Sequence, residues 1–211
     1  MLIIPEIETV VILPPRTGSG SLYRAVLAAY PKAFMPYRHM EADGVPFGYD
    51  RWRRIGVLRH PLARLWSLYN YLKTFGEDDE DRGHFDNYYR SRRESVNRPF
   101  AEWLVENEMP FSSQFDDLGV VRPQYTVNHP MPETRKSQFV YLRPDLGVEI
   151  VPYTPDASEI GKALGIEVPA IANVTGAGRW IPPISAEGQR HLDMFHSWDL
   201  AACAQRSVPF T

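Results

Sequence analysis

The sequence predicts an α/β fold in which helices flank a central, mostly parallel β-sheet. An apolar, β-branched run over 10–13 leads through a glycine-containing turn into an amphipathic segment over 22–29. A second apolar run over 54–59 leads into another amphipathic segment over 62–75. Two strand-to-helix units in succession are typical of α/β layer folds. With 211 residues, 44% of them hydrophobic, the chain is expected to form a single domain over 1–211 with a substantial core.

Capping, turn and breaker residues place the remaining predicted elements. Pro61 suits the first turn of the second helix, Gly165 is a helix stop and Ser185 is a helix cap. The further elements are a strand candidate over 34–40, a loop with a short helix over 43–52, an exposed acidic loop over 76–83, a short helix over 99–106, strands over 139–142 and 148–151, a helix over 156–164, a long loop over 169–183 and a closing helix from 185 to about 205.

Composition and charge argue against several classes of function. The formal net charge of −3 is not that of a general polyanion binder, so no nucleic-acid partner is expected. The single cysteine, Cys203, allows no intrachain disulfide and no cysteine-based metal site. The first residues lack a basic leader pattern, and no segment approaches the ~18 to 20 continuous apolar residues of a membrane span. We therefore expect a soluble, cytoplasmic chain without a membrane partner.

The turn between the first strand and its helix has the features of a phosphate cradle. Backbone N–H groups at a helix N-terminus favour an anion, and Gly18 and Gly20 let a ligand approach the backbone closely. Arg16 adds a positive charge with forked donors. The turn departs from the Walker pattern because Gly20, rather than a lysine, precedes Ser21. A glycine-rich turn that binds nothing is the alternative interpretation.

The second strand-to-helix unit carries another candidate anion site. Arg59 leaves the end of the strand, and Ser67 lies two turns into the helix that follows. A phosphate between them would accept hydrogen bonds from a forked guanidinium and from a hydroxyl. The two units together therefore predict a ligand that carries anionic groups at two points.

The segments 15–22 and 57–69 resemble the sulfotransferases that use 3′-phosphoadenosine 5′-phosphosulfate (PAPS), especially the carbohydrate-type and bacterial group. The resemblance implies a P-loop-like three-layer fold and a reaction that releases 3′-phosphoadenosine 5′-phosphate (PAP). It also implies that Arg59 and Ser67 hold the 3′-phosphate and that Arg179 contacts the nucleotide from a lid. The residues that it assigns to the 5′-phosphosulfate loop are Arg16, Thr17, Gly18, Ser19, Gly20, Ser21 and Leu22.

The match has one departure and leaves one contact open. Gly20 stands where the family more often has a hydroxyl residue, which removes one donor to the phosphosulfate. Ser21 stands where cytosolic members have a tryptophan, so the residue that stacks on adenine stays unassigned. Arg64 and Tyr69 also match the family pattern, with less clear roles.

The resemblance implies in-line transfer of a sulfuryl group to an acceptor hydroxyl, with a carbohydrate as one candidate acceptor. Arg16 is the candidate that polarises the leaving oxygen, and no metal is required if arginine and backbone N–H groups supply the positive charge. His39 is the candidate base because an ordinary histidine pKa lies near neutrality. Glu41 and Asp43 are the alternative bases, and a structural role is the alternative for His39.

Two other functions stay open at this point. One is a P-loop-type nucleotide or small-molecule kinase, against which the missing Walker lysine counts. The other is a nucleotide-binding module without catalytic activity. The sequence specifies neither the acceptor nor the oligomeric state.

Overall fold

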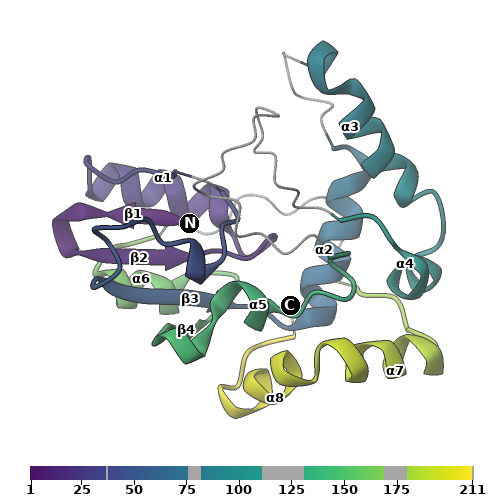
Figure 1. Ribbon diagram of the computed structural model, residues 1–211. Helices are drawn as coiled ribbons and strands as arrows, with labels where there is room; N and C mark the ends of the chain where they lie inside the picture. The colour runs from purple at the N-terminus through teal and green to yellow at the C-terminus, as the bar shows by residue number, and fades with distance from the viewer. Residues whose placement is uncertain (37, 76–81, 111–130, 169–179, 211) are drawn as a thin grey trace.

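A computed structural model describes residues 1–36, 38–75, 82–110, 131–168 and 180–210. Within these ranges the chain has a mixed α/β fold, with an open sheet flanked by helices (Figure 1). The sheet has the order β1-β2-β3-β4, in which β1 is antiparallel to β2 and the other pairs are parallel. Its strands are β1 (Leu2–Ile4), β2 (Thr9–Ile12), β3 (Arg53–Leu58) and β4 (Glu149–Pro152).

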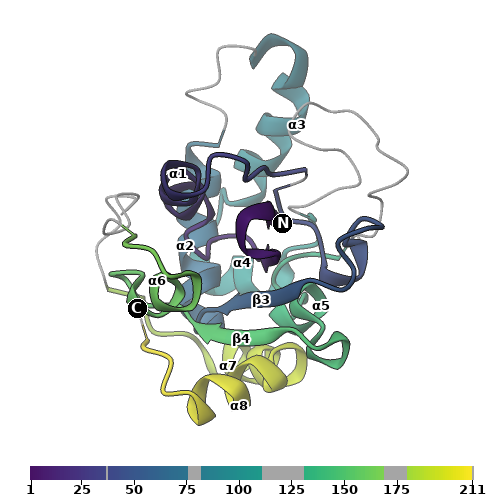
Figure 2. The ribbon, with the colours of Figure 1, turned by 90° about the vertical axis from the view of Figure 1, so that its left-hand side faces the viewer.

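Helices cover both faces of this sheet, because side chains of alternate strand residues point to opposite sides. Val11 and Val57 belong to one apolar cluster with residues of α1 and α6, and Val10 and Leu58 belong to another with residues of α5 and α8. Figure 2 shows these helices around the sheet. A third apolar cluster joins α2, α3, α4 and α7. The helices are α1 (Ser19–Ala29), α2 (Pro61–Lys73), α3 (Arg82–Ser95), α4 (Phe100–Glu106), α5 (Gln138–Leu142), α6 (Ser158–Leu164), α7 (Ala186–Phe195) and α8 (Ser197–Gln205).

The predicted strand-to-helix units are confirmed. The first runs from β2 into α1 and the second from β3 into α2, with Pro61 in the first turn of α2. The predicted strand at 148–151 is β4, and the predicted helices at 99–106 and 156–164 are α4 and α6. Gly165 ends α6 in the left-handed conformation, and the Ser185 hydroxyl accepts a hydrogen bond from the Gly188 amide at the start of α7.

Three predictions of secondary structure are wrong. The apolar run at 139–142 forms helix α5 instead of a strand, because the Ser137 hydroxyl caps it by accepting from the Phe139 amide at 3.1 Å. The described residues of 34–40 contribute one bridge, between Phe34 and Ile3, instead of a strand. The closing helix is two helices separated at His196, whose ring is held by the Thr134 carbonyl at 2.8 Å.

Other expectations are met only in part by the described residues. The short helix expected within 43–52 is a single 3-10 turn, Ala42–Gly44. Residues 76–81 of the acidic loop and 169–179 of the long loop lie outside the described ranges. Among the helices that the structure describes, none is long and apolar enough to cross a lipid bilayer.

Candidate functional site

The loop from β2 into α1 has an unusual backbone. Arg16 and Gly18 both adopt left-handed conformations, with φ of 68° and 82°. A long side chain seldom occupies this region, so the surroundings of Arg16 must hold it there. The Thr17 hydroxyl contributes by donating to the Pro14 carbonyl at 2.7 Å. This backbone conformation directs the Arg16 side chain toward α2, where it reaches Ser67.

The two predicted anion-binding segments meet through their arginines. Arg16 Nε donates to the Ser67 hydroxyl at 3.1 Å, and its guanidinium carbon lies 4.4 Å from the centre of the Tyr71 ring. Arg59 Nη1 donates to the Arg16 carbonyl at 2.9 Å. The Arg59 guanidinium carbon lies 4.6 Å from the centre of the Tyr153 ring. The structure thus brings Arg16, Arg59 and Ser67 together. It adds Tyr71 and Tyr153 to these predicted anion-binding residues.

This arginine pair, Arg16 and Arg59, is electropositive and half-buried. Burial is the main cause that lowers the pKa of Arg16, and the Tyr71 and Tyr153 rings oppose it. Burial also lowers the pKa of Arg59 to about 10; the Tyr153 ring opposes this shift, and the charges of Arg16 and Arg64 add to it. Both guanidiniums stay charged at neutral pH. A bound anion would therefore be stabilised by two cations that repel one another.

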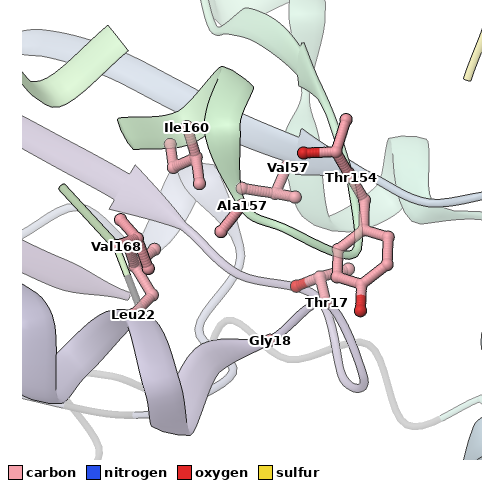
Figure 3. Close-up of a pocket in the computed structure, with 9 residues that line it drawn as sticks. Thr17, Gly18, Leu22, Val57, Thr154, Ala157, Ile160 and Val168 are labelled. Atoms are coloured by element: carbon pink, nitrogen blue, oxygen red, sulfur yellow. The ribbon is translucent and has the colours of Figure 1, made fainter. Parts of the chain in front are cut away.

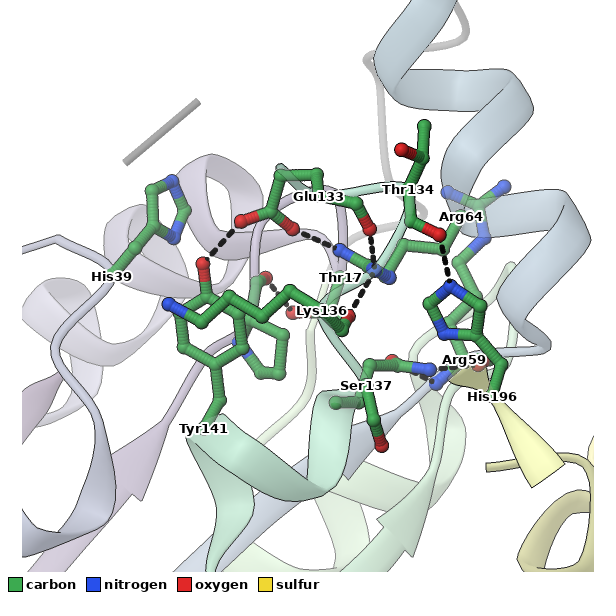
Figure 4. Close-up of polar contacts among 12 residues, drawn as sticks. Thr17, His39, Arg59, Arg64, Glu133, Thr134, Lys136, Ser137, Tyr141 and His196 are labelled. Carbon is green, nitrogen blue, oxygen red and sulfur yellow. Dashed lines mark hydrogen bonds and ion pairs between the residues drawn. The ribbon is translucent and has the colours of Figure 1, made fainter. Parts of the chain in front are cut away.

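The nearby basic side chains beneath the site are neutralised within the chain. Arg64 Nη1 lies 2.6 Å from Glu133 (Figure 4). Lys136 Nζ lies 2.7 Å from Glu41, and all four side chains are buried. Among the described residues, Arg16 instead contacts a hydroxyl and an aromatic ring. A buried ion usually has an opposite charge beside it, so the surroundings of Arg16 favour an external anion.

His39 lies beside the first loop. Its Nδ1 is 2.9 Å from the Leu13 carbonyl, which can only accept, so Nδ1 carries the hydrogen and the neutral ring has its lone pair on Nε2. Burial lowers the pKa of His39 to about 3; the bond to Leu13 opposes the shift, and the charges of Arg38 and Arg16 add to it. The ring is therefore neutral at pH 7, in a tautomer that can accept a proton at Nε2.

The alternative bases are both engaged in ion pairs. Glu41 is fully buried and pairs with Lys136, while Asp43 Oδ2 lies 2.9 Å from Arg143 Nη1. Each of these carboxylates is therefore already engaged by a cation of the chain. Of the three candidates, His39 is the one whose side chain is neutral at pH 7, with its lone pair on Nε2.

A small, mostly apolar pocket opens beside the loop, between α1, α6 and the ends of β3 and β4 (Figure 3). Its volume is about 10 Å³, roughly the space of one water molecule. The lining residues are Thr17, Gly18, Leu22, Val57, Tyr153, Thr154, Ala157, Ile160 and Val168. Tyr153 therefore joins the pocket to the arginine pair.

The other predicted nucleotide-binding residues have separate places. Ser19, Gly20, Ser21 and Leu22 form the first turn of α1, where the first three N–H groups precede the helical hydrogen bonds and the Leu22 amide donates to the Gly18 carbonyl at 3.1 Å. The Ser21 hydroxyl is buried without a hydrogen-bond partner among the described residues, and Leu22 is largely in the core. Arg179 lies outside the described residues.

Sequence analysis did not assign roles to Tyr71, Tyr153 and Gln138. Tyr71 is one helical turn beyond Ser67, and that spacing could have placed both on the same face of α2. Tyr153 directly follows β4, at the carboxyl end where ligands bind in open α/β sheets. Gln138 carried no signal, because its contact with Arg59 joins residues that are 79 positions apart.

The fold and the site define an α/β chain with a candidate anion-binding centre at the carboxyl ends of its parallel strands. Comparisons with protein-family models, with curated proteins and with solved structures find no match. Among the described residues, no group of three His, Cys, Asp or Glu side chains is placed to hold a metal ion.

Proposed function

We propose that this chain is a PAPS-dependent sulfotransferase with a P-loop-like fold, which moves a sulfuryl group to an acceptor hydroxyl. The observation that carries the proposal is the meeting of Arg16 and Arg59 beside the N-terminus of α1. Two half-buried guanidiniums and a helix N-terminus favour a ligand with several negative charges. A nucleotide with phosphates at both its 3′ and 5′ positions has this character.

The residues divide between the two ends of such a nucleotide. The first-turn amides of α1 and the loop residues Thr17 and Gly18 suit the 5′-phosphosulfate, while Arg59 and Ser67 suit the 3′-phosphate. Arg16 stands between them, because it already donates to Ser67. A nucleotide that used both ends would take over this hydrogen bond and leave the Arg16 guanidinium for the oxygen that bridges phosphate and sulfur.

At about 10 Å³ the pocket beside the loop cannot enclose an adenine base, so the base would lie against the Tyr153 ring that lines it. The lining of the pocket is mostly apolar, and Thr17 and Thr154 add hydroxyl groups. Tyr153 offers an aromatic face at the same place, and a base stacked on an aromatic side chain gains about 1–3 kcal/mol. We therefore assign the adenine contact that the sequence left open to Tyr153.

PAPS supplies the sulfuryl group and a leaving oxygen on PAP. In the proposed reaction His39 Nε2 takes the proton of the acceptor hydroxyl as its oxygen bonds to sulfur. Arg16 stabilises the negative charge that collects on the bridging oxygen as its bond to sulfur breaks. An anionic ligand near His39 raises the pKa of the ring from about 3, which makes it a stronger base when the nucleotide is bound.

The test is a binding titration with PAP, with adenosine 5′-monophosphate (AMP) and with ATP plus Mg²⁺. The proposal predicts that PAP binds at least tenfold more tightly than AMP, because only PAP has the 3′-phosphate. Equal affinity for PAP and AMP would contradict it, and a clear preference for ATP would favour the kinase alternative. Transfer of labelled sulfate that disappears in His39→Ala, with PAP binding retained, separates an enzyme from a binding module.

A further inference from the structure

Gln138 holds the backbone of Arg59 from two sides. The pairing of β3 with β4 ends at Leu58 and Pro152, so the peptide groups of Arg59 lie beyond the ladder. The Arg59 amide donates to Gln138 Oε1 at 3.1 Å, and Gln138 Nε2 donates to the Arg59 carbonyl at 2.7 Å. A carboxamide offers an acceptor and a donor in one plane, and it thereby takes the place of a neighbouring strand.

The Gln138 side chain is itself fixed from α8. It is fully buried, and its main-chain amide donates to Asp199 Oδ2 at 2.9 Å. The Ser137 hydroxyl donates to Asp199 Oδ1 at 2.7 Å. Asp199 also lies 3.2 Å from His196 Nδ1, whose other ring nitrogen contacts Thr134. These contacts attach the start of α5 firmly to the C-terminal helices.

The protonation state of Asp199 follows from its hydrogen-bond partners. Burial would raise the pKa of Asp199, but the bonds from His196, Gln138 and Ser137 outweigh it and hold the pKa below its ordinary value. Asp199 therefore accepts hydrogen bonds as a carboxylate at neutral pH. Asp199 keeps its negative charge and its hydrogen bonds from Ser137 and Gln138 at the neutral pH at which the site would work.

We infer that Gln138 is a positioning residue that sets where the Arg59 guanidinium meets an anionic ligand. The inference rests on the proposed function, in which Arg59 binds the 3′-phosphate. From this fixed backbone the Arg59 side chain reaches the Arg16 carbonyl and the Tyr153 ring. A binding site needs its side chains within about 0.5 Å of the productive geometry, so release of the backbone weakens the contact with the phosphate.

The variant that tests this is Gln138→Met, which has a similar volume and neither hydrogen bond. We expect the preference for PAP over AMP to fall about tenfold, since only PAP engages Arg59. In an Arg59→Ala background, Gln138→Met should cause no further change in that preference. The matched control is Val148→Ala. Val148 is buried and packs beside Gly56, so its truncation lowers stability at a position away from Arg59. This variant should leave the preference for PAP over AMP unchanged.

The outcomes distinguish the inference from the proposed function. If Arg59→Ala binds PAP as tightly as the wild type, the proposed function fails. If Arg59→Ala binds weakly while Gln138→Met keeps the wild-type preference, the positioning inference fails. Should Gln138→Met not fold, Gln138→Glu replaces it, because a carboxylate can accept from the Arg59 amide but repels the Arg59 carbonyl. An unchanged preference in that variant equally overturns the inference.

Discussion

Arg64 and Arg16 show two ways in which this chain holds a buried or half-buried positive charge. Arg64 is fully buried, lies 2.6 Å from the Glu133 carboxylate, and also donates to the main-chain carbonyl of Lys136. Arg16 contacts the Ser67 hydroxyl and the Tyr71 ring at the edge of the site. The chain itself offsets the desolvation of Arg64, whereas an anion from outside would have to offset that of Arg16. The first arginine therefore serves the fold, and the second is suited to a ligand.

The largest expected effect comes from breaking the Arg64 pair. Arg64→Ala leaves the Glu133 carboxylate buried without a cation among the described residues, with the Tyr141 hydroxyl still donating to it, and should lower the free energy of unfolding by about 3–5 kcal/mol. Urea denaturation followed by circular dichroism measures this. The control is Arg53→Ala, which removes an exposed pair with Glu149 and should cost no more than about 1 kcal/mol. Equal losses for the two variants would mean that burial does not separate structural from surface charges here.

The next effect concerns ligand affinity instead of stability. Arg16→Ala removes a half-buried cation, so the free energy of unfolding should change by no more than about 1 kcal/mol. The affinity for PAP should fall roughly 10- to 100-fold, since a hydrogen bond to a charged group contributes about 1.5–3 kcal/mol. Calorimetric titration and denaturation of the same protein measure both quantities. A large loss of stability with unchanged affinity would place Arg16 with Arg64 as a structural residue.

Sequence reasoning located Arg16 and Arg59 because their positions depend on local patterns, but it gave Arg64 no clear role. The apolar runs before Arg16 and Arg59 predict parallel strands, and the carboxyl ends of parallel strands lie at one edge of a sheet. Placing Arg16 near Arg59 follows from that rule, whereas Ser67 lies two turns into α2, beyond the end of its strand. His39 could be proposed from its position between the two units, but its neutral state depends on burial and on the Leu13 carbonyl.

The remaining features depend on contacts between distant parts of the chain. A four-residue apolar run at 139–142 fits a strand or a short helix equally well, and the Ser137 cap together with the Asp199 contact decides for the helix. The helix break at His196 likewise depends on Thr134, which lies 62 positions earlier. Without α5 in place, neither the role of Gln138 nor the support of Arg59 could be predicted.

A smaller effect should appear in the pH dependence of stability. The pKa of His39 is about 3 in the folded chain, against an ordinary value near 6.5, so the unfolded chain binds the extra proton between these values. The contribution of His39 is complete above about pH 6.5 and is lost as the pH falls toward 3, with a slope of at most about 1.4 kcal/mol per pH unit.

The variant His39→Asn isolates this contribution, because an amide can still donate to the Leu13 carbonyl but does not titrate. Unfolding free energies between pH 4 and 8 should fall less steeply for the variant than for the wild type. His60 also has a lowered pKa, about 4, and is present in both proteins, so the difference between the two curves removes it. Parallel curves would show that His39 is not held neutral by burial, which would also weaken its assignment as the base.

The smallest expected effect is the contribution of the Tyr71 ring, which lies against the Arg16 guanidinium, to the affinity for PAP. A guanidinium over an aromatic ring gains about 0.5–1 kcal/mol where it is partly exposed, so Tyr71→Leu should weaken PAP binding by roughly two- to fivefold. Tyr71→Phe keeps the ring and serves as the matched control, with an affinity close to that of the wild type. Both variants keep an apolar side chain against Phe75, which packs on the same ring. If Tyr71→Phe loses as much affinity as Tyr71→Leu, the hydroxyl rather than the ring acts in the site, and Tyr71 would contact the ligand instead of orienting Arg16.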